Sequence, residues 1–194
     1  FLSLRGGAKY LTTEHVNLVK HIFLDCNENI DLPKVTKVKD LNNSYLKWID
    51  EYFQIDHSYF NNLFITGTNG KTTTQSFLSQ ILKNNGIKHA SSGTLGTFIN
   101  EQKIFKNELT TEEPVFIRNL MSKCFRSNIK NIIFEASSIG VDKNRLQGLK
   151  VNHAIFTNIS RDHLDYHGSL KNYINAKFKF CLLYTSPSPR DTIR

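Results

Sequence analysis

Hydrophobic residues recur along the second part of this chain in short runs, and stretches with helical spacing separate them. Such runs predict strands at residues 63–66, 87–90, 131–134 and 154–157. Strands this short and apolar, alternating with helices, are typical of a mostly parallel sheet with helices on both faces. We therefore expect an α/β fold whose ligand-binding groups gather at the carboxyl ends of the strands.

Apolar residues three and four positions apart predict helices between these strands. In the first helix, one face carries Phe77, Leu78, Ile81 and Leu82. This helix is expected to end near Gly86, because glycine is common just after a helix C-terminus. In a second helix, the buried face is expected to carry Ile117, Leu120, Met121 and Cys124. A further helical segment is predicted over residues 173–180.

The first 61 residues follow a less regular pattern. Helices are predicted around residues 13–20 and 45–53, and short strands at residues 22–24 and 35–38. Because the pattern changes near residue 62, we expect part of a small α/β N-terminal domain over residues 1–61. Part of a central domain is expected over residues 62–180.

Both ends of the sequence have features that we expect of a truncated chain. The single methionine is Met121, so no initiator methionine stands at the start. After residue 180 the composition changes abruptly to a stretch that contains Pro187 and Pro189. We expect residues 181–194 to be non-native sequence, the alternative being a natural disordered tail.

Composition and charge narrow the class of protein. A hydrophobic content of 39% is ordinary for a soluble globular protein. No apolar run approaches the roughly 20 residues that cross a bilayer, so we expect a cytoplasmic protein without membrane contact. The three cysteines have neither a disulfide nor a zinc-site spacing. The formal charge of +8 comes from scattered lysines without a nucleic-acid-binding motif, and it favours anionic small molecules.

The strongest chemical signal is the stretch Gly67-Thr68-Asn69-Gly70-Lys71-Thr72-Thr73-Thr74. It follows a predicted strand and precedes a predicted helix, as a phosphate-binding loop does. Its glycines permit a tight turn whose N–H groups point at phosphate oxygens, beside the positive end of the helix. Lys71 would neutralise the β- and γ-phosphates of ATP, and the Thr72 hydroxyl would bind Mg²⁺. The alternative is a glycine-rich turn that binds no nucleotide.

Two further segments place metal-binding residue types after predicted strands. Glu135 follows the strand at 131–134, where a carboxylate either binds Mg²⁺ or faces water. The segment that leaves the last strand gathers Asn158, Asp162, His163, Asp165 and His167. Such a density of polar side chains at a strand end is hard to explain by folding alone.

Together these motifs resemble the Mur ligase family. The residues that carry the resemblance are the loop Gly67 to Thr74, Glu135-Ala136-Ser137-Ser138, Thr157-Asn158 and Asp162-His163-Leu164-Asp165-Tyr166-His167-Gly168. It covers about residues 63–180, most of the family's central ATP-binding domain, and is strongest to members that add the third residue of the peptidoglycan stem peptide. Residues 1–61 are weakly similar to the family's N-terminal domain, which holds a uridine nucleotide. The family's C-terminal domain, which receives the amino acid, is absent from the chain.

The resemblance implies roles for individual residues. It assigns ATP binding to Gly67, Thr68, Asn69, Gly70, Lys71, Thr72, Thr73 and Asn158. It assigns two Mg²⁺ ions to Thr72, Glu135, His163 and Lys177. Lys177 would be carbamylated, which turns a cationic amine into an anionic oxygen ligand. Contacts with the UDP-MurNAc-dipeptide substrate would come from Thr110, Thr111, Ser137 and Arg145. The catalytic residues would be Lys71, Glu135, His163 and Lys177.

Several positions keep a second interpretation or depart from the family pattern. Lys177 could instead be a surface lysine, and Arg145 could be a solvated cation at the end of a helix. His167 could be a structural histidine that forms a hydrogen bond. The residues that differ from the family pattern are Leu109, Ile139 and Lys143. These differences bear on the substrate contacts more than on the ATP contacts.

The activity that the resemblance implies is ATP-dependent amide-bond formation in peptidoglycan precursor synthesis. A substrate carboxylate would be phosphorylated to an acyl phosphate, and the amine of an amino acid, expected to be meso-diaminopimelate, would displace the phosphate. We expect a monomer that acts on small molecules. Three alternatives stay open: a ligase similar to folylpolyglutamate synthases, a P-loop switch or kinase, and a fragment that binds nucleotide without completing ligation.

Overall fold

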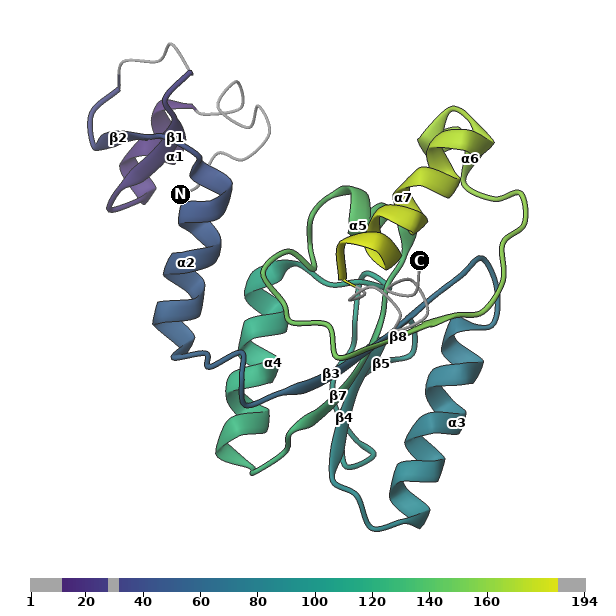
Figure 1. Cartoon of the computed structure of the whole chain (residues 1–194). Helices are drawn as coiled ribbons and strands as arrows, with labels where there is room; N and C mark the ends of the chain where they lie inside the picture. Colours follow the sequence, from purple (N-terminus) through teal and green to yellow (C-terminus); the bar gives the residue numbers. More distant parts are fainter. Residues whose placement is uncertain (1–11, 28–31, 185–194) are drawn as a thin grey trace, which may run out of the picture. The chain divides into compact units, whose positions relative to one another are not determined.

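The computed structural model describes residues 12–27 and 32–184 (Figure 1). The chain divides into two compact units, Phe1–Tyr52 and Phe53–Arg194. This division lies before the boundary expected at residue 61. The reason is that Ile55, Tyr59 and Phe60 pack against the hydrophobic core of the second unit. The expectation for residues 181–194 falls largely outside the described residues, although the last helix continues through Tyr184.

The first unit has a simple α/β arrangement. Its elements are α1 (Thr13–Leu18), β1 (Ile22–Asp25), β2 (Val35–Val38) and α2 (Leu41–Phe53). The strands β1 and β2 pair in parallel, with Ile22 opposite Val35. A small apolar cluster of Val16, Ile22 and Leu24 is buried here. The expected helices and strands of this unit are confirmed.

The second unit is built on a six-stranded sheet with the order β6-β5-β4-β7-β3-β8. The strands are β3 (Asn61–Thr66), β4 (His89–Gly93), β5 (Gly96–Ile99), β6 (Gln102–Phe105), β7 (Asn131–Glu135) and β8 (His153–Phe156). Strands β4, β7, β3 and β8 are parallel, and β5 and β6 add an antiparallel hairpin beside β4. The expected mostly parallel sheet is confirmed, and the hairpin was not expected.

Helices cover both faces of this sheet, as the alternation of strands and helices predicts. They are α3 (Lys71–Asn84), α4 (Pro114–Arg126), α5 (Ser138–Asp142), α6 (Leu164–His167) and α7 (Leu170–Tyr184). Figure 1 shows α3 and α4 on opposite sides of the strands. Within residues 12–27 and 32–184, no helix is long and apolar enough to cross a membrane.

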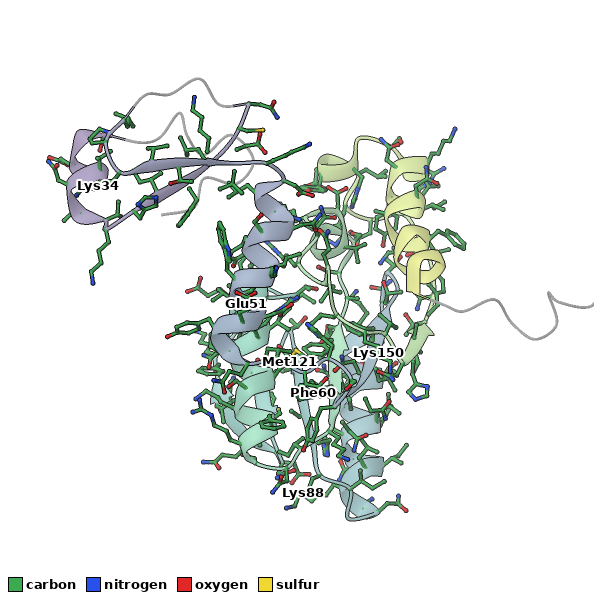
Figure 2. All side chains as sticks on the ribbon, turned by 60° about the vertical axis from the view of Figure 1, so that its left-hand side comes forward. Lys34, Glu51, Phe60, Lys88, Met121 and Lys150 are labelled. Carbon is green, nitrogen blue, oxygen red and sulfur yellow. The ribbon has the colours of Figure 1, made fainter. Side chains whose placement is uncertain are left out.

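The main hydrophobic core lies between the sheet and α4. The face of α4 predicted to be buried is confirmed, and Met121 and Phe60 both belong to this core (Figure 2). The rings of Phe64 and Phe134 stack in it with centroids 5.1 Å apart. Burial raises the pKa of the Cys124 thiol to about 12, so this cysteine is a core residue and not a reactive thiol.

On the other side of the sheet, the apolar face predicted for α3 is buried only in part, because Leu78 and Leu82 are half-buried and the other two residues are not. Phe77 and Ile81 are 66% and 55% exposed. The buried side chain is Gln75, whose Nε2 donates to the carbonyl of Ser92 on β4 at 3.0 Å and to that of Ile133 on β7 at 3.2 Å. A buried amide that satisfies two strand carbonyls fixes the face of a helix as firmly as apolar packing does.

Because Phe77 is exposed, we expect Phe77→Ala to change the free energy of unfolding by less than about 0.5 kcal/mol. Urea unfolding followed by circular dichroism measures this value. A loss above about 1.5 kcal/mol would mean that the ring is covered, in disagreement with its position here.

One strand boundary also differs from the expectation. The strand predicted at residues 87–90 begins instead at His89, because the C-terminal cap that follows α3 extends through Ile87. Gly86 has a φ of +69°, and the Ile87 N–H donates to the Leu82 carbonyl at 2.9 Å, which closes the last turn of the helix. Residues 86 and 87 therefore belong to the helix cap and not to the sheet.

Candidate functional site

The loop Gly67 to Thr74 connects the carboxyl end of β3 to the start of α3. Gly70 is the N-cap of α3, has a φ of +82°, and offers no side chain to cap the helix. The first N–H groups of a helix have no partner within the helix, and they attract anions together with the helix dipole. The loop and α3 therefore have the local structure that an anion-binding site needs.

Residues that follow β8 fix the shape of this loop. Asn158 accepts a hydrogen bond from the Asn69 N–H at 3.0 Å through its side chain and one from the Thr68 N–H at 2.9 Å through its carbonyl. Thr157 Oγ1 donates to the Asn69 carbonyl at 2.7 Å. A Cβ atom placed on Gly67 would collide with Thr157 Oγ1. The predicted Asn158 contact with ATP is untested, but its side chain holds the loop.

Two lysine amines meet at one loop carbonyl. Lys71 Nζ donates to the carbonyls of Gly67 at 2.9 Å and Thr68 at 2.8 Å, and Lys177 Nζ donates to Gly67 at 2.7 Å. Burial lowers the pKa of the Lys71 amine, and the carboxylates of Glu135 and Asp162 oppose this shift. Lys177 is 1% exposed, so its interpretation as a surface lysine is wrong.

Glu135 ends β7 with its carboxylate beside the first turn of α3. The side chain is 1% exposed and accepts hydrogen bonds from Thr72 Oγ1 at 3.0 Å and from the N–H and hydroxyl of Thr94, both at 3.1 Å. Its interpretation as a water-facing carboxylate is therefore wrong. A buried carboxylate with two hydroxyl oxygens next to it is a set of hard oxygen donors, which fits Mg²⁺.

Thr94 is the contributor that the sequence reasoning missed. It follows Gly93 at the carboxyl end of β4, and β4 pairs with β7, which carries Glu135. The signal was available, because polar residues after neighbouring parallel strands meet at one edge of the sheet. Because the strand was predicted to end at residue 90, Thr94 was not recognised as a residue at a strand end.

His163 lies beside the loop without a hydrogen bond to it among the described residues. It precedes α6 with a φ of +50°, an uncommon conformation for a residue with a side chain. Its Nε2 is 3.6 Å from the Asp162 carboxylate, and its ring centroid is 6.3 Å from that of Tyr173 on α7. The part of the chain that the structure describes contains no group of three His, Cys, Asp or Glu residues able to hold a metal ion.

The paired threonines lie next to Glu135. Thr111 Oγ1 donates to the Glu135 backbone carbonyl at 2.9 Å and accepts from the Ser137 N–H at 2.9 Å. Thr110 Oγ1 is 3.2 Å from Thr94 Oγ1. Thr110 and Thr111 are thus brought to the same sheet edge as the loop, and their contact with substrate is untested.

Ser137 and Arg145 border the same edge. The Ser137 hydroxyl accepts from the Gly140 N–H at 3.0 Å and caps the short helix α5. Arg145 is buried, donates to the Thr111 carbonyl at 3.1 Å and pairs with Glu113 at 2.8 Å. Its interpretation as a solvated cation is therefore wrong.

His167 fits the interpretation of a structural histidine. It is buried, and its Nε2 lies 3.1 Å from the Ser138 hydroxyl. Burial lowers the pKa of this imidazole, although the carboxylates of Asp142 and Asp165 oppose the shift. A neutral His167 then joins α6 to α5.

Known proteins are similar to this chain in both sequence and fold. Residues 65–188 match the Mur ligase middle domain. A UDP-N-acetylmuramoyl-L-alanyl-D-glutamate–2,6-diaminopimelate ligase from Rickettsia montanensis is 36% identical over 170 residues, which are 86% of this chain and 35% of the relative. A solved structure of a ligase with the same name superposes with a TM-score of 0.70 and 26% identity, over 82% of this chain and 32% of that one.

A more distant likeness concerns the fold alone. Folylpolyglutamate synthase from Mycobacterium tuberculosis, solved as a complex with ADP, superposes with a TM-score of 0.57 at 15% identity, over 76% of this chain and 39% of that one. The chain spans about a third of the length of the curated relatives it matches. The matching family domain covers most of the second unit, including the loop, Glu135 and Lys177. The chain therefore belongs to the Mur ligase family.

Proposed function

We propose that this chain is part of an ATP-dependent ligase that joins meso-diaminopimelate to UDP-MurNAc-L-Ala-D-Glu in peptidoglycan precursor synthesis. The names of its relatives support this substrate pair. The observation that carries the proposal is the buried Glu135 carboxylate, which lies against Thr72 at the start of α3. Residues 1–61 would belong to the uridine-nucleotide domain and residues 62–180 to the central domain. The enzyme would be a cytoplasmic monomer that binds no nucleic acid.

In this proposal the triphosphate of ATP lies against the N-terminus of α3. The N–H groups of the first turn of α3, Lys71 to Thr73, would donate to the phosphates, because those of Thr68 and Asn69 already donate to Asn158. The Lys71 ammonium would offset phosphate charge. Thr72 and Glu135, joined by Thr94, would hold one Mg²⁺. A bound Mg²⁺ supplies positive charge that stabilises phosphoryl transfer to the substrate carboxylate, which forms an acyl phosphate.

A second cation would need an anionic oxygen ligand at Lys177. Carbamylation would supply one, because the deprotonated amine adds to carbon dioxide and releases a proton, which leaves an anionic carbamate with two oxygens. The carbamate nitrogen keeps one hydrogen, so the hydrogen bond from Lys177 to the Gly67 carbonyl survives the modification. His163, beside Tyr173, is the proposed nitrogen ligand.

The substrate carboxylate would approach from the side of Thr110, Thr111 and Ser137. Thr111 is hydrogen-bonded to the Glu135 carbonyl and to Ser137, so the acceptor and the phosphate donor would meet near Glu135. Arg145 would orient the dipeptide, in competition with its ion pair to Glu113. Selection of the incoming amino acid would lie elsewhere in the full-length protein.

Glu135→Gln tests the proposed metal site, because it keeps the size of the side chain and removes its charge. We expect Mg²⁺-dependent binding of ADP to weaken at least about tenfold, since a carboxylate is the stronger ligand for a hard cation. Calorimetric titrations of the chain with ADP at several Mg²⁺ concentrations measure the effect. Glu101→Gln, which changes an exposed carboxylate paired with Lys83, is expected to bind normally.

Two results would contradict the proposal. If Glu135→Gln keeps the Mg²⁺ dependence of the unaltered chain, Glu135 is not a ligand. If the full-length protein forms an amide with a folate substrate and not with UDP-MurNAc-dipeptide, the activity is that of a folylpolyglutamate synthase, whose fold is similar.

A further inference from the structure

Tyr173 is a buried side chain that the proposed chemistry does not use. It lies on α7 and is 0% exposed. Its hydroxyl is 2.7 Å from Oγ1 of Thr68, which lies in the phosphate-binding loop. A buried tyrosine hydroxyl needs a polar partner, and here that partner belongs to the phosphate-binding loop and not to the core.

Thr68 Oγ1 also contacts the backbone of Ser160. It accepts from the Ser160 N–H at 2.9 Å and lies 3.3 Å from the Ser160 carbonyl. Either hydroxyl can be the donor in the 2.7 Å hydrogen bond between Tyr173 and Thr68, and both arrangements join α7 to the loop. Burial raises the pKa of the Tyr173 hydroxyl, which keeps its proton in place.

The ring of Tyr173 faces the other side chains of the proposed site. In the unmodified side chain, Lys177 Nζ lies over this ring, 4.9 Å from its centroid. The ring of His167 is 5.4 Å away and that of His163 is 6.3 Å away, centroid to centroid. Lys177 follows Tyr173 by one helical turn, so both project from the same face of α7.

Two residues of α7 thus contact two consecutive residues of the loop. Tyr173 holds Thr68 through its hydroxyl, and Lys177 holds the Gly67 carbonyl through its amine. The two contacts lie one helical turn apart, so together they hold this part of α7 against the loop.

We propose that Tyr173 is a positioning residue, which fixes the phosphate-binding loop relative to Lys177 and His163. It does not touch nucleotide or substrate and acts through Thr68. This inference rests on the proposed function, because Gly67, Lys177 and His163 matter in this way only if the loop binds nucleotide. It explains why a tyrosine and not a phenylalanine stands beneath Lys177.

Tyr173→Phe tests this role, because it keeps the ring and removes only the hydroxyl. In the full-length protein we expect the KM for ATP to rise at least about fivefold and kcat to fall, with the KM for UDP-MurNAc-dipeptide unchanged. In the 194-residue chain, calorimetry should show ADP binding that is at least about fivefold weaker. A purely structural role would lower the melting temperature and leave the affinity of the folded protein for nucleotide unchanged.

Tyr166→Phe is the matched control. Tyr166 is exposed on the neighbouring helix α6 and donates its hydroxyl to Asp142 at 2.9 Å. Its replacement is expected to leave the KM for ATP unchanged. An equal rise in both variants would overturn the proposal, because it would show a general effect of loosening this group of helices.

Thr68→Ala removes the same hydrogen bond from the side of the loop and keeps the proposal testable if Tyr173→Phe does not fold. We expect Thr68→Ala to weaken ADP binding, and the double variant to bind no more weakly than the worse single variant. Fully additive losses would overturn the inference. If the unaltered chain binds no nucleotide, the proposed function fails. If it binds and Tyr173→Phe binds equally well, the inference about Tyr173 alone fails.

Discussion

Lys71→Ala is expected to abolish ATP turnover in the full-length protein, with a loss of about 10²-fold or more, and to leave the fold nearly unchanged. The amine of Lys71 donates only to two loop carbonyls, those of Gly67 and Thr68. Lys177 continues to donate to Gly67 after the substitution, so that carbonyl keeps a partner. The folded state therefore loses little, whereas the phosphates lose their nearest cation.

Phosphate release and urea unfolding separate the two effects. Lys83→Ala is the matched control, because Lys83 is an exposed lysine of the same helix that pairs with Glu101 at 2.6 Å. It is expected to keep normal turnover. Normal turnover in Lys71→Ala would refute the assignment of this loop to ATP.

Gly67→Ala is expected to lose both stability and nucleotide binding. The added Cβ would collide with Thr157 Oγ1 and lie 3.1 Å from the N and O atoms of Asn158. Gly67 also has a φ of +144°, which side-chain-bearing residues rarely adopt. Because the neighbours are held by their own hydrogen bonds to the loop, we expect a loss of about 3 kcal/mol or more in the free energy of unfolding.

Gly86→Ala provides the comparison for Gly67→Ala. Gly86 also has a positive φ, of +69°, but nothing lies within 4 Å of a Cβ placed there. It should cost about 1 kcal/mol from backbone strain alone and leave ADP binding unchanged. Denaturant unfolding and calorimetry measure both variants. Equal losses in the two would show that close approach to Thr157 does not matter.

The parts of the site that lie close together in sequence could be predicted. The loop depends on a glycine-lysine-threonine order within a few residues, and Glu135 depends on its place after an apolar strand. Thr94 was missed because the strand before it was predicted to end at residue 90, whereas β4 ends at Gly93. Tyr173 could not be found in this way, because its role comes from a contact with Thr68, which is distant in the chain. No local pattern of residues encodes such contacts.

For the fold, too, features set by neighbouring residues could be predicted, and features set by contacts between distant residues could not. The strand and helix alternation predicted the α/β class, but not the hairpin of β5 and β6. Its turn places Asn100 and Glu101 at φ values of +44° and +70°. Turns with two positive φ values favour Asn-Gly, so a glutamate at the second position concealed the hairpin. The order of strands in the sheet depends on pairings between distant segments and was not predictable.

Gln75 links the two elements that carry the proposed metal ligands. Its amide joins α3 to β4 and to β7, and β7 ends at Glu135. The 3.0 Å separation of the Thr72 hydroxyl and the Glu135 carboxylate therefore depends on a buried amide that is hydrogen-bonded to backbone carbonyls and not to either of these groups.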